Sequence, residues 1–227
     1  MSKETQAPIV EFCQHLLSAH GDSPAGVGWT GADADVRYRV MLESIRERGA
    51  PCTLLDFGCG AGHLLEHLRA HGPDGVDYHG LDASAAAIEL CRSKFPGVPF
   101  ECRDVLAPEG GDWPSYDYIV MNGIFTYRGG VDQDAMFDYC RRLLRAVFPH
   151  VRVGLAFNVM SKQVDWERDD LFHLPTDHLL GFLARELSRH VVVRHDYGLY
   201  EYTVYVYAAP SAPEMAASKP RIERSPG

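Results

Sequence analysis

The residues best suited to chemistry are three glycines, Gly58, Gly60 and Gly62, which follow an apolar segment ending near Asp56 and precede a helical pattern. Glycine permits positive φ angles and lets backbone N–H groups approach a ligand closely. The N-terminus of the following helix favours a negatively charged group. Glycine-rich turns also close strands for structural reasons alone, so the residues around this turn decide its interpretation.

Polar residues follow the next three apolar segments at positions that should meet this turn. Asp82 and Ala83 come twenty residues beyond the last glycine, where a carboxylate can accept hydrogen bonds from two ribose hydroxyls. Asp104 and Val105 follow the third segment, where an acidic side chain can accept from an exocyclic amine of adenine, and Asn122 follows the fourth. Because open α/β sheets bind ligands at the carboxyl ends of their strands, these residues predict one pocket.

The elements that must position these residues alternate between short apolar segments and helical patterns, which is typical of a parallel sheet covered on both faces. Seven strands are expected, at 53–57, 78–81, 99–103, 116–121, 151–158, 191–195 and 200–208. Helices are expected at 62–70, 84–94, 134–148 and 176–188, preceded by helical patterns at 8–20 and 33–48. The last two strands are four residues apart, so they must form an antiparallel hairpin. The expected class is α/β.

The chain divides into three expected parts: a helical cap at 1–49, an α/β domain at 50–209 and a polar, proline-rich tail at 210–227 that we expect to be disordered. With 22 Lys+Arg against 31 Asp+Glu, the net charge of −9 argues against a nucleic-acid partner. No apolar run approaches the ~20 residues of a membrane span, and the start lacks the pattern of a signal peptide. We therefore expect a cytoplasmic protein with no membrane partner.

The cysteines and histidines do not predict a metal site. The six cysteines contain no C-x-x-C pair, which favours reduced thiols. His63, His67 and His71 lie one turn apart on the helix after the glycines, but they flank its apolar stripe and lack a completing ligand. We expect no metal and an exposed polar stripe, with a position near the ligand as the alternative for His63 alone.

Two cofactors fit the glycine turn, a dinucleotide and S-adenosylmethionine. A dinucleotide turn has the spacing G-x-G-x-x-G, whereas this chain has G-x-G-x-G with Asp56 two residues before the first glycine. The spacing disfavours a dinucleotide. Over about residues 50–208 the chain resembles the class I S-adenosylmethionine-dependent methyltransferases: Asp56 to Gly62 matches their first motif, Asp82 the ribose acid, and Asp104-Val105 the adenine-side motif. The resemblance implies a Rossmann-like sheet of seven strands, mostly parallel with an antiparallel last strand, and S-adenosylmethionine as cofactor.

A narrower resemblance links the chain to small bacterial methyltransferases that have a Gly-Trp loop, a helix carrying an arginine, and a tyrosine-rich last strand. The matching residues are Gly28-Trp29, Arg37-Tyr38, the segment 122–125 and the segment 194–201. This resemblance implies that Trp29 and Arg37 help close the cofactor site, with Arg37 a candidate partner of the methionine carboxylate. Substrates vary across such proteins, so the resemblance indicates the chemistry and not the acceptor.

Topology suggests where an acceptor would bind. An antiparallel last strand begins on the ligand face, so the turn that starts at His195 should open beside the glycines, as should the segment with Tyr127 and Arg128. These three residues are the candidate catalytic residues, and the insert at 161–175 is a candidate lid. An alcohol or phenol acceptor would need a base, for which His195 has a suitable intrinsic pKa, whereas an amine or carboxylate would not.

The expected function is methyl transfer to an O or N nucleophile of a small molecule, in the biosynthesis of a secondary metabolite or modified sugar. Three alternatives stay open: a cofactor-binding protein without catalysis, a dinucleotide oxidoreductase, and a methyltransferase of a macromolecular acceptor. The sequence does not fix the oligomeric state.

Overall fold

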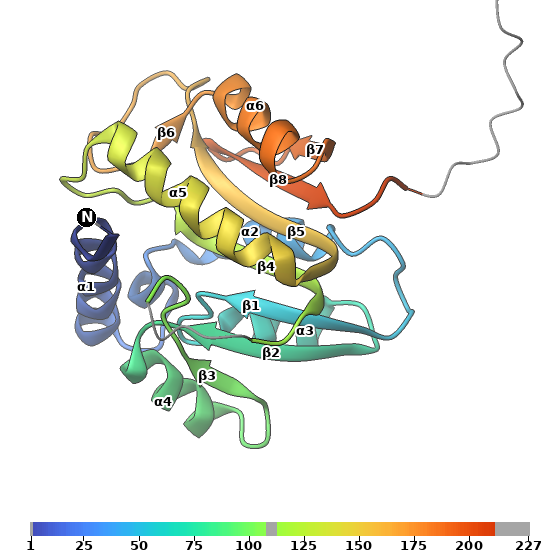
Figure 1. The fold of residues 1–227 in the computed structure, drawn as a ribbon. Coiled ribbons are helices and arrows are strands. Elements are labelled where there is room, and N and C mark those ends of the chain that lie inside the picture. The colour runs from blue at the N-terminus through green and yellow to red at the C-terminus, as the bar shows by residue number, and fades with distance from the viewer. Residues whose placement is uncertain (1, 108–112, 212–227) are drawn as a thin grey trace, which may run out of the picture.

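A twisted sheet forms the centre of the computed structural model, which describes residues 2–107 and 113–211 (Figure 1). Its strands are β1 (Cys52–Phe57), β2 (Val76–Asp82), β3 (Phe100–Cys102), β4 (Tyr116–Phe125), β5 (Val151–Ser161), β6 (His173–Leu174), β7 (His190–Arg194) and β8 (Glu201–Tyr207). The order across the sheet is β3-β2-β1-β4-β5-β8-β7, with β6 pairing to β5. All seven strands expected from the sequence are present, and the two-residue β6 is too short to leave a pattern.

The strands from β1 to β5 pair in parallel, whereas β8 runs antiparallel to both β5 and β7. The expected fold class, a mostly parallel Rossmann-like sheet with an antiparallel last strand, is therefore confirmed. Every residue of β8 is buried, as expected for a strand covered on both faces.

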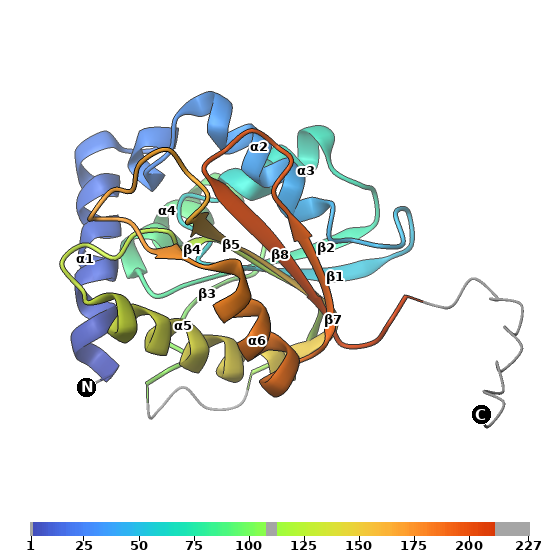
Figure 2. The same ribbon diagram turned by 90° about the horizontal axis from the view of Figure 1, so that it is seen from above.

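Helices cover both faces of the sheet (Figure 2). Helices α5 (Gln133–Val147) and α6 (Thr176–Glu186) pack on one face, and α2 (Gly31–Leu42), α3 (His63–His71) and α4 (Ala85–Lys94) pack on the other. Successive residues of β1 point to opposite faces, so Leu54 joins the α2–α4 core and Leu55 joins the α5–α6 core. Because both faces of the sheet are buried in this way, the strands are held in place, and so are their carboxyl ends.

Helix α1 (Ser2–His20) stands beside those carboxyl ends, where it contacts α4, α5 and the short helix η1 (Pro24–Val27) (Figure 1). The second expected helix, at 33–48, is shorter in the structure. It begins two residues earlier, at Gly31 after the cap residue Thr30, and it already ends at Leu42. A short 3₁₀ turn, η2 (Phe148–His150), links α5 to β5. Most of the expected tail lies outside the described residues.

Candidate functional site

The glycine turn between β1 and α3 has a backbone that other residues could not adopt without strain. Gly58, Gly60 and Gly62 have φ angles of +79°, +52° and +77°. The N–H of Gly58 donates to the carbonyl of Leu81 at 2.7 Å, which ties the turn to the end of β2. A Cβ atom at Gly58 would lie 2.3 Å from the side chain of Ile124. The turn therefore requires glycine for its backbone conformation.

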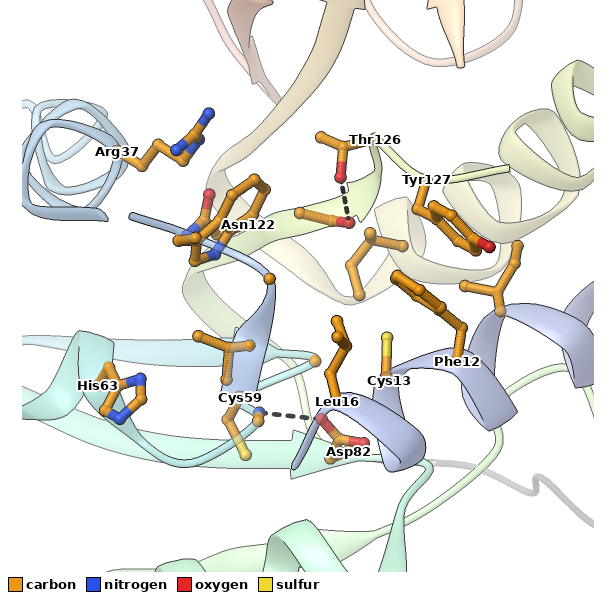
Figure 3. Close-up of a pocket in the computed structure, with 18 of the residues that line it drawn as sticks. Phe12, Cys13, Leu16, Arg37, Cys59, His63, Asp82, Asn122, Thr126 and Tyr127 are labelled. Atoms are coloured by element: carbon orange, nitrogen blue, oxygen red, sulfur yellow. Dashed lines mark hydrogen bonds between the residues drawn. The ribbon is translucent and has the colours of Figure 1, made fainter. Parts of the chain in front are cut away.

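Asp82, at the end of β2, is hydrogen-bonded to this turn. Its Oδ2 accepts from the N–H of Gly60 at 2.9 Å (Figure 3), and its Oδ1 accepts from the N–H of Ser84 at 2.8 Å. Burial raises the pKa of Asp82. Each carboxylate oxygen keeps a second lone pair, so the geometry leaves room for two further donors.

Asp56 lies beneath the turn as a buried carboxyl group. The hydroxyl of Tyr78 donates to its Oδ2 at 2.7 Å, and burial raises the pKa of Asp56 to about 7. At the end of β3, Asp104 accepts from the N–H of Leu106 at 2.9 Å. Carboxylates at the ends of three strands therefore face one space, as the sequence predicted.

That space is a cavity of about 890 Å³, within the ~300–1,000 Å³ typical of ligand pockets. The structure places almost all predicted cofactor residues on its wall: Trp29, Arg37, Asp56, Gly58, Gly60, Asp82, Ala83, Asp104, Val105 and Asn122. Gly62 is the exception, because it faces Phe95 and begins α3. Sequence reasoning missed the contribution of α1, which places Phe12, Cys13 and Leu16 in the cavity (Figure 3).

Arg37 is held by a buried ion pair with Glu201, the first residue of β8. Its Nε donates to Oε2 of Glu201 at 2.9 Å, and Nδ2 of Asn158 donates to Oε1 of Glu201 at 2.9 Å. Only 8% of Arg37 and 1% of Glu201 are exposed. The guanidinium lies 3.9 Å from the ring centre of Trp29, and its Nη1 is buried with no hydrogen-bond partner among the described residues. The sequence analysis did not select Glu201 or Asn158 as site residues. Each is a polar residue in a largely apolar strand, and that pattern could have indicated a site residue.

Tyr127 lies on the cavity wall, where its ring stacks on Phe12 with centroids 3.7 Å apart (Figure 3). Arg128, its neighbour, does not line the cavity. Its guanidinium donates to the backbone carbonyls of Leu171 at 3.1 Å and Val131 at 2.6 Å. The expectation of an acceptor-binding role for Arg128 is therefore corrected: this cation holds two loops together.

His195 is exposed and lies outside the cavity, contrary to its predicted place. The turn after β7 does reach the cavity, but through residues 198–200. Arg194 pairs with Asp196 at 2.8 Å and with Glu43 of the segment after α2 at 2.6 Å, so the first half of the turn faces outward. The ring of His195 packs on Tyr202 instead. A general-base role for His195 has no geometric support.

The segment between β5 and α6 covers the far end of the cavity, where Trp166, Arg168, Asp170, Leu171 and His173 line it. The sequence predicted a lid here. These residues put the segment on the cavity wall, and its role as a lid stays a prediction.

His63, at the start of α3, also lines the cavity, and its Nε2 lies 2.8 Å from Oδ1 of Asp22. Asp22 additionally accepts from Nζ of Lys94 at 2.7 Å, so it joins the loop after α1 to α3 and α4. Within the described ranges, no cluster of His, Cys, Asp and Glu could hold a metal ion. No helix in those ranges is long and apolar enough to cross a bilayer.

Comparisons with known proteins show the family of the chain. A family model described as a methyltransferase domain matches residues 55–146. The Mycobacterium tuberculosis protein named "Putative methyltransferase Rv1506c" is 32% identical over 164 residues, which cover 70% of this chain and 95% of that protein. A trans-aconitate 2-methyltransferase of Methylobacterium nodulans is 35% identical over 96 residues, 41% of this chain and 33% of the relative.

Solved structures show the same fold at low sequence identity. The magnesium protoporphyrin IX methyltransferase of Synechocystis, with bound S-adenosylmethionine, superposes with a TM-score of 0.61 at 11% identity, over 90% of this chain and 97% of that one. Its likeness supports the arrangement of strands and helices around the cavity.

Proposed function

Because the chain belongs to the class I S-adenosylmethionine-dependent methyltransferases, we propose that it transfers the methyl group of S-adenosylmethionine to a small-molecule acceptor. The observation that carries the proposal is the extent of the cavity. It begins at the glycine turn and Asp82 and continues past Asn122 to an aromatic region under the 161–175 segment. A cofactor in the first half would leave the second half for an acceptor.

The residues of the first half fit the cofactor. Asp82 has free lone pairs for two ribose hydroxyls, and Asp104 with Val105 lies where the adenine would be. We assign Arg37 to the methionine carboxylate, because Arg37 lines the cavity and its Nη1 has no hydrogen-bond partner among the described residues. The bound cofactor supplies an electrophilic methyl group on a sulfonium ion. The chain's own contribution is to align the acceptor within ~3–3.5 Å of that group and to exclude water.

A small acceptor suits the enclosure of the second half. Helix α1 and the 161–175 segment both contribute residues to its wall, and a pocket built from the residues of several elements suits a small acceptor better than a folded macromolecule. The net charge of −9 also opposes a nucleic-acid acceptor. The relatives named trans-aconitate 2-methyltransferases provide further support for an acceptor of this size.

Two measurements test the proposal. Titration calorimetry should show binding of S-adenosylhomocysteine and no binding of a nicotinamide dinucleotide. Incubation of the full chain with methyl-labelled S-adenosylmethionine and a protein-free metabolite extract should label a small molecule, and an Asp82→Ala variant should label far less. Label that enters only added protein or nucleic acid would contradict a small acceptor. Binding without any transfer would favour the non-catalytic alternative.

A further inference from the structure

The acceptor half of the cavity, the half that the cofactor would leave free, has two exposed aromatic side chains on its wall. Trp166, in the segment between β5 and α6, is 63% exposed, and Tyr200, on the turn before β8, is 58% exposed. Among the described residues, Val192 is the one other large apolar side chain that is exposed, and it does not line the cavity. Single exposed apolar residues are common, but two at one cavity indicate a surface that a ligand covers.

The ring of Trp166 has no partner, unlike the rings of the other two tryptophans. The ring centre of Trp29 lies 3.9 Å from a guanidinium, and Trp113 stacks on an imidazole with centroids 3.9 Å apart. Neither Trp166 nor Tyr200 makes a ring or cation contact with another described residue. Their exposed faces are therefore open to a flat ligand.

Trp166 and Tyr200, which we call the aromatic mouth, belong to neighbouring segments. The N–H of Ser161, the last residue of β5, donates to the carbonyl of Tyr200 at 3.0 Å, so the turn before β8 lies against the start of the segment that carries Trp166. That segment is tied down at its other end, where the N–H of Phe172 donates to the carbonyl of Thr126 at 2.8 Å. The exposed tryptophan is therefore presented by a segment that is anchored at both ends.

The wall next to the aromatic mouth is apolar and aromatic. Met160 directly precedes Ser161 in β5, and Leu171 forms a bridge to Tyr127, whose ring stacks on Phe12 with centroids 3.7 Å apart. All of these residues except Ser161 line the cavity. The acceptor half therefore offers apolar contact both at its opening and inside.

From these contacts, and resting on the proposed function, we propose that the methyl acceptor carries a flat aromatic ring system, which the aromatic mouth holds. Aromatic rings prefer offset-stacked or edge-to-face contacts, and an acceptor ring on Trp166 and Tyr200 removes their exposed apolar surface from water. A sugar can also lie on a tryptophan ring, but its hydroxyl groups need hydrogen-bond partners, which Phe12, Met160 and Leu171 do not supply.

Binding of a plain aromatic probe tests the proposal without knowledge of the acceptor. The full chain, saturated with S-adenosylhomocysteine, is titrated with 2-naphthol in a calorimeter, and methyl α-D-glucoside is the sugar probe. We expect 2-naphthol to bind, and Trp166→Ala and Tyr200→Ala each to weaken its binding ~2- to 10-fold, the contribution of one aromatic contact. Val192→Ala is the matched control, because this exposed side chain does not line the cavity and its loss should leave the affinity unchanged.

The outcomes separate the proposal from the function on which it rests. Equal 2-naphthol binding in all four proteins, no 2-naphthol binding, or glucoside binding that the same variants lose would each overturn the aromatic acceptor. Failure of S-adenosylhomocysteine to bind would overturn the proposed function as well. Both substituted side chains are more than half exposed, so the variants should fold, and an unchanged affinity for S-adenosylhomocysteine checks this.

The labelled product provides an independent test. Label transferred from S-adenosylmethionine to a metabolite extract should appear in a product that a reversed-phase column retains and that absorbs near-ultraviolet light. With the acceptor isolated in this way, Trp166→Ala should raise KM and keep kcat, because a contact with the non-reacting part of the acceptor binds the ground state and the transition state alike. A labelled sugar or aliphatic acid would overturn the aromatic acceptor and leave the small-molecule methyltransferase intact, whereas no transfer at all would contradict both.

Discussion

The Arg37–Glu201 pair offers the sharpest test of how this fold holds its site. Replacement of Glu201 by Gln leaves the Arg37 guanidinium in a place where only 8% of the residue reaches solvent. The glutamine keeps the side-chain volume and an oxygen that can still accept from Nδ2 of Asn158. The substitution therefore isolates the loss of negative charge next to a buried cation.

Removal of one partner of a buried ion pair costs about 3–5 kcal/mol, because the other charge stays buried without compensation. The retained hydrogen bond to Asn158 places Glu201→Gln at the lower end, about 3 kcal/mol. For a chain of 150–250 residues this is a fall in Tm of about 6–12 °C. Urea unfolding should show a lower midpoint with an unchanged m value.

A matched control is Glu186→Gln, which breaks the Arg145–Glu186 pair on the surface. Exposed pairs contribute ~0–1 kcal/mol, so this variant should unfold close to the unsubstituted protein. The double variant Arg37→Met/Glu201→Leu removes both charges and should recover most of the stability that Glu201→Gln loses. Equal and small losses for Glu201→Gln and Glu186→Gln would refute the reasoning, because they would mean that the guanidinium finds water or another partner.

Three further predictions concern the site. Asp82→Ala removes the acceptor for ribose hydroxyls, and because a hydrogen bond to a charged group contributes ~1.5–3 kcal/mol, calorimetry should show S-adenosylhomocysteine binding weakened ~10- to 100-fold. Burial raises the pKa of Asp56 to about 7, so between the unfolded value of about 4 and pH 7 the folded state retains a proton that the unfolded state releases. Stability should therefore fall as pH rises through that window, by at most ~1.4 kcal/mol per unit, and Asp56→Asn should flatten the fall in urea titrations at several pH values. His195→Ala should keep kcat within about threefold, since a loss in the 10²- to 10⁴-fold range of general-base catalysis would return this exposed histidine to the mechanism.

Local pattern was enough to predict the sheet and to bring the ends of several strands to one cavity. Alternating apolar segments and helices place strand ends together, so Asp82, Asp104 and Asn122 could be placed at one edge from chain order alone. The conformation of the glycine turn also depends on its own residues, since positive φ at Gly58 and Gly60 needs no distant partner.

The acceptor half could not be predicted in the same way, because it depends on contacts between distant segments. His195 lies outside the cavity because Arg194 pairs with Glu43, a residue 151 positions away in the chain. Arg128 is diverted to the carbonyl of Leu171 by a loop whose path has no periodic pattern. The place of Phe12 on the wall follows from the docking of α1, which spacing does not reveal.

The docking of α1 also gives one helix a place on two parts of the cavity wall. Phe12 faces the acceptor half, while Cys13 and Leu16 of the same helix face the cofactor half (Figure 3). Any displacement of α1 therefore changes the wall on the Phe12 side and on the Leu16 side together.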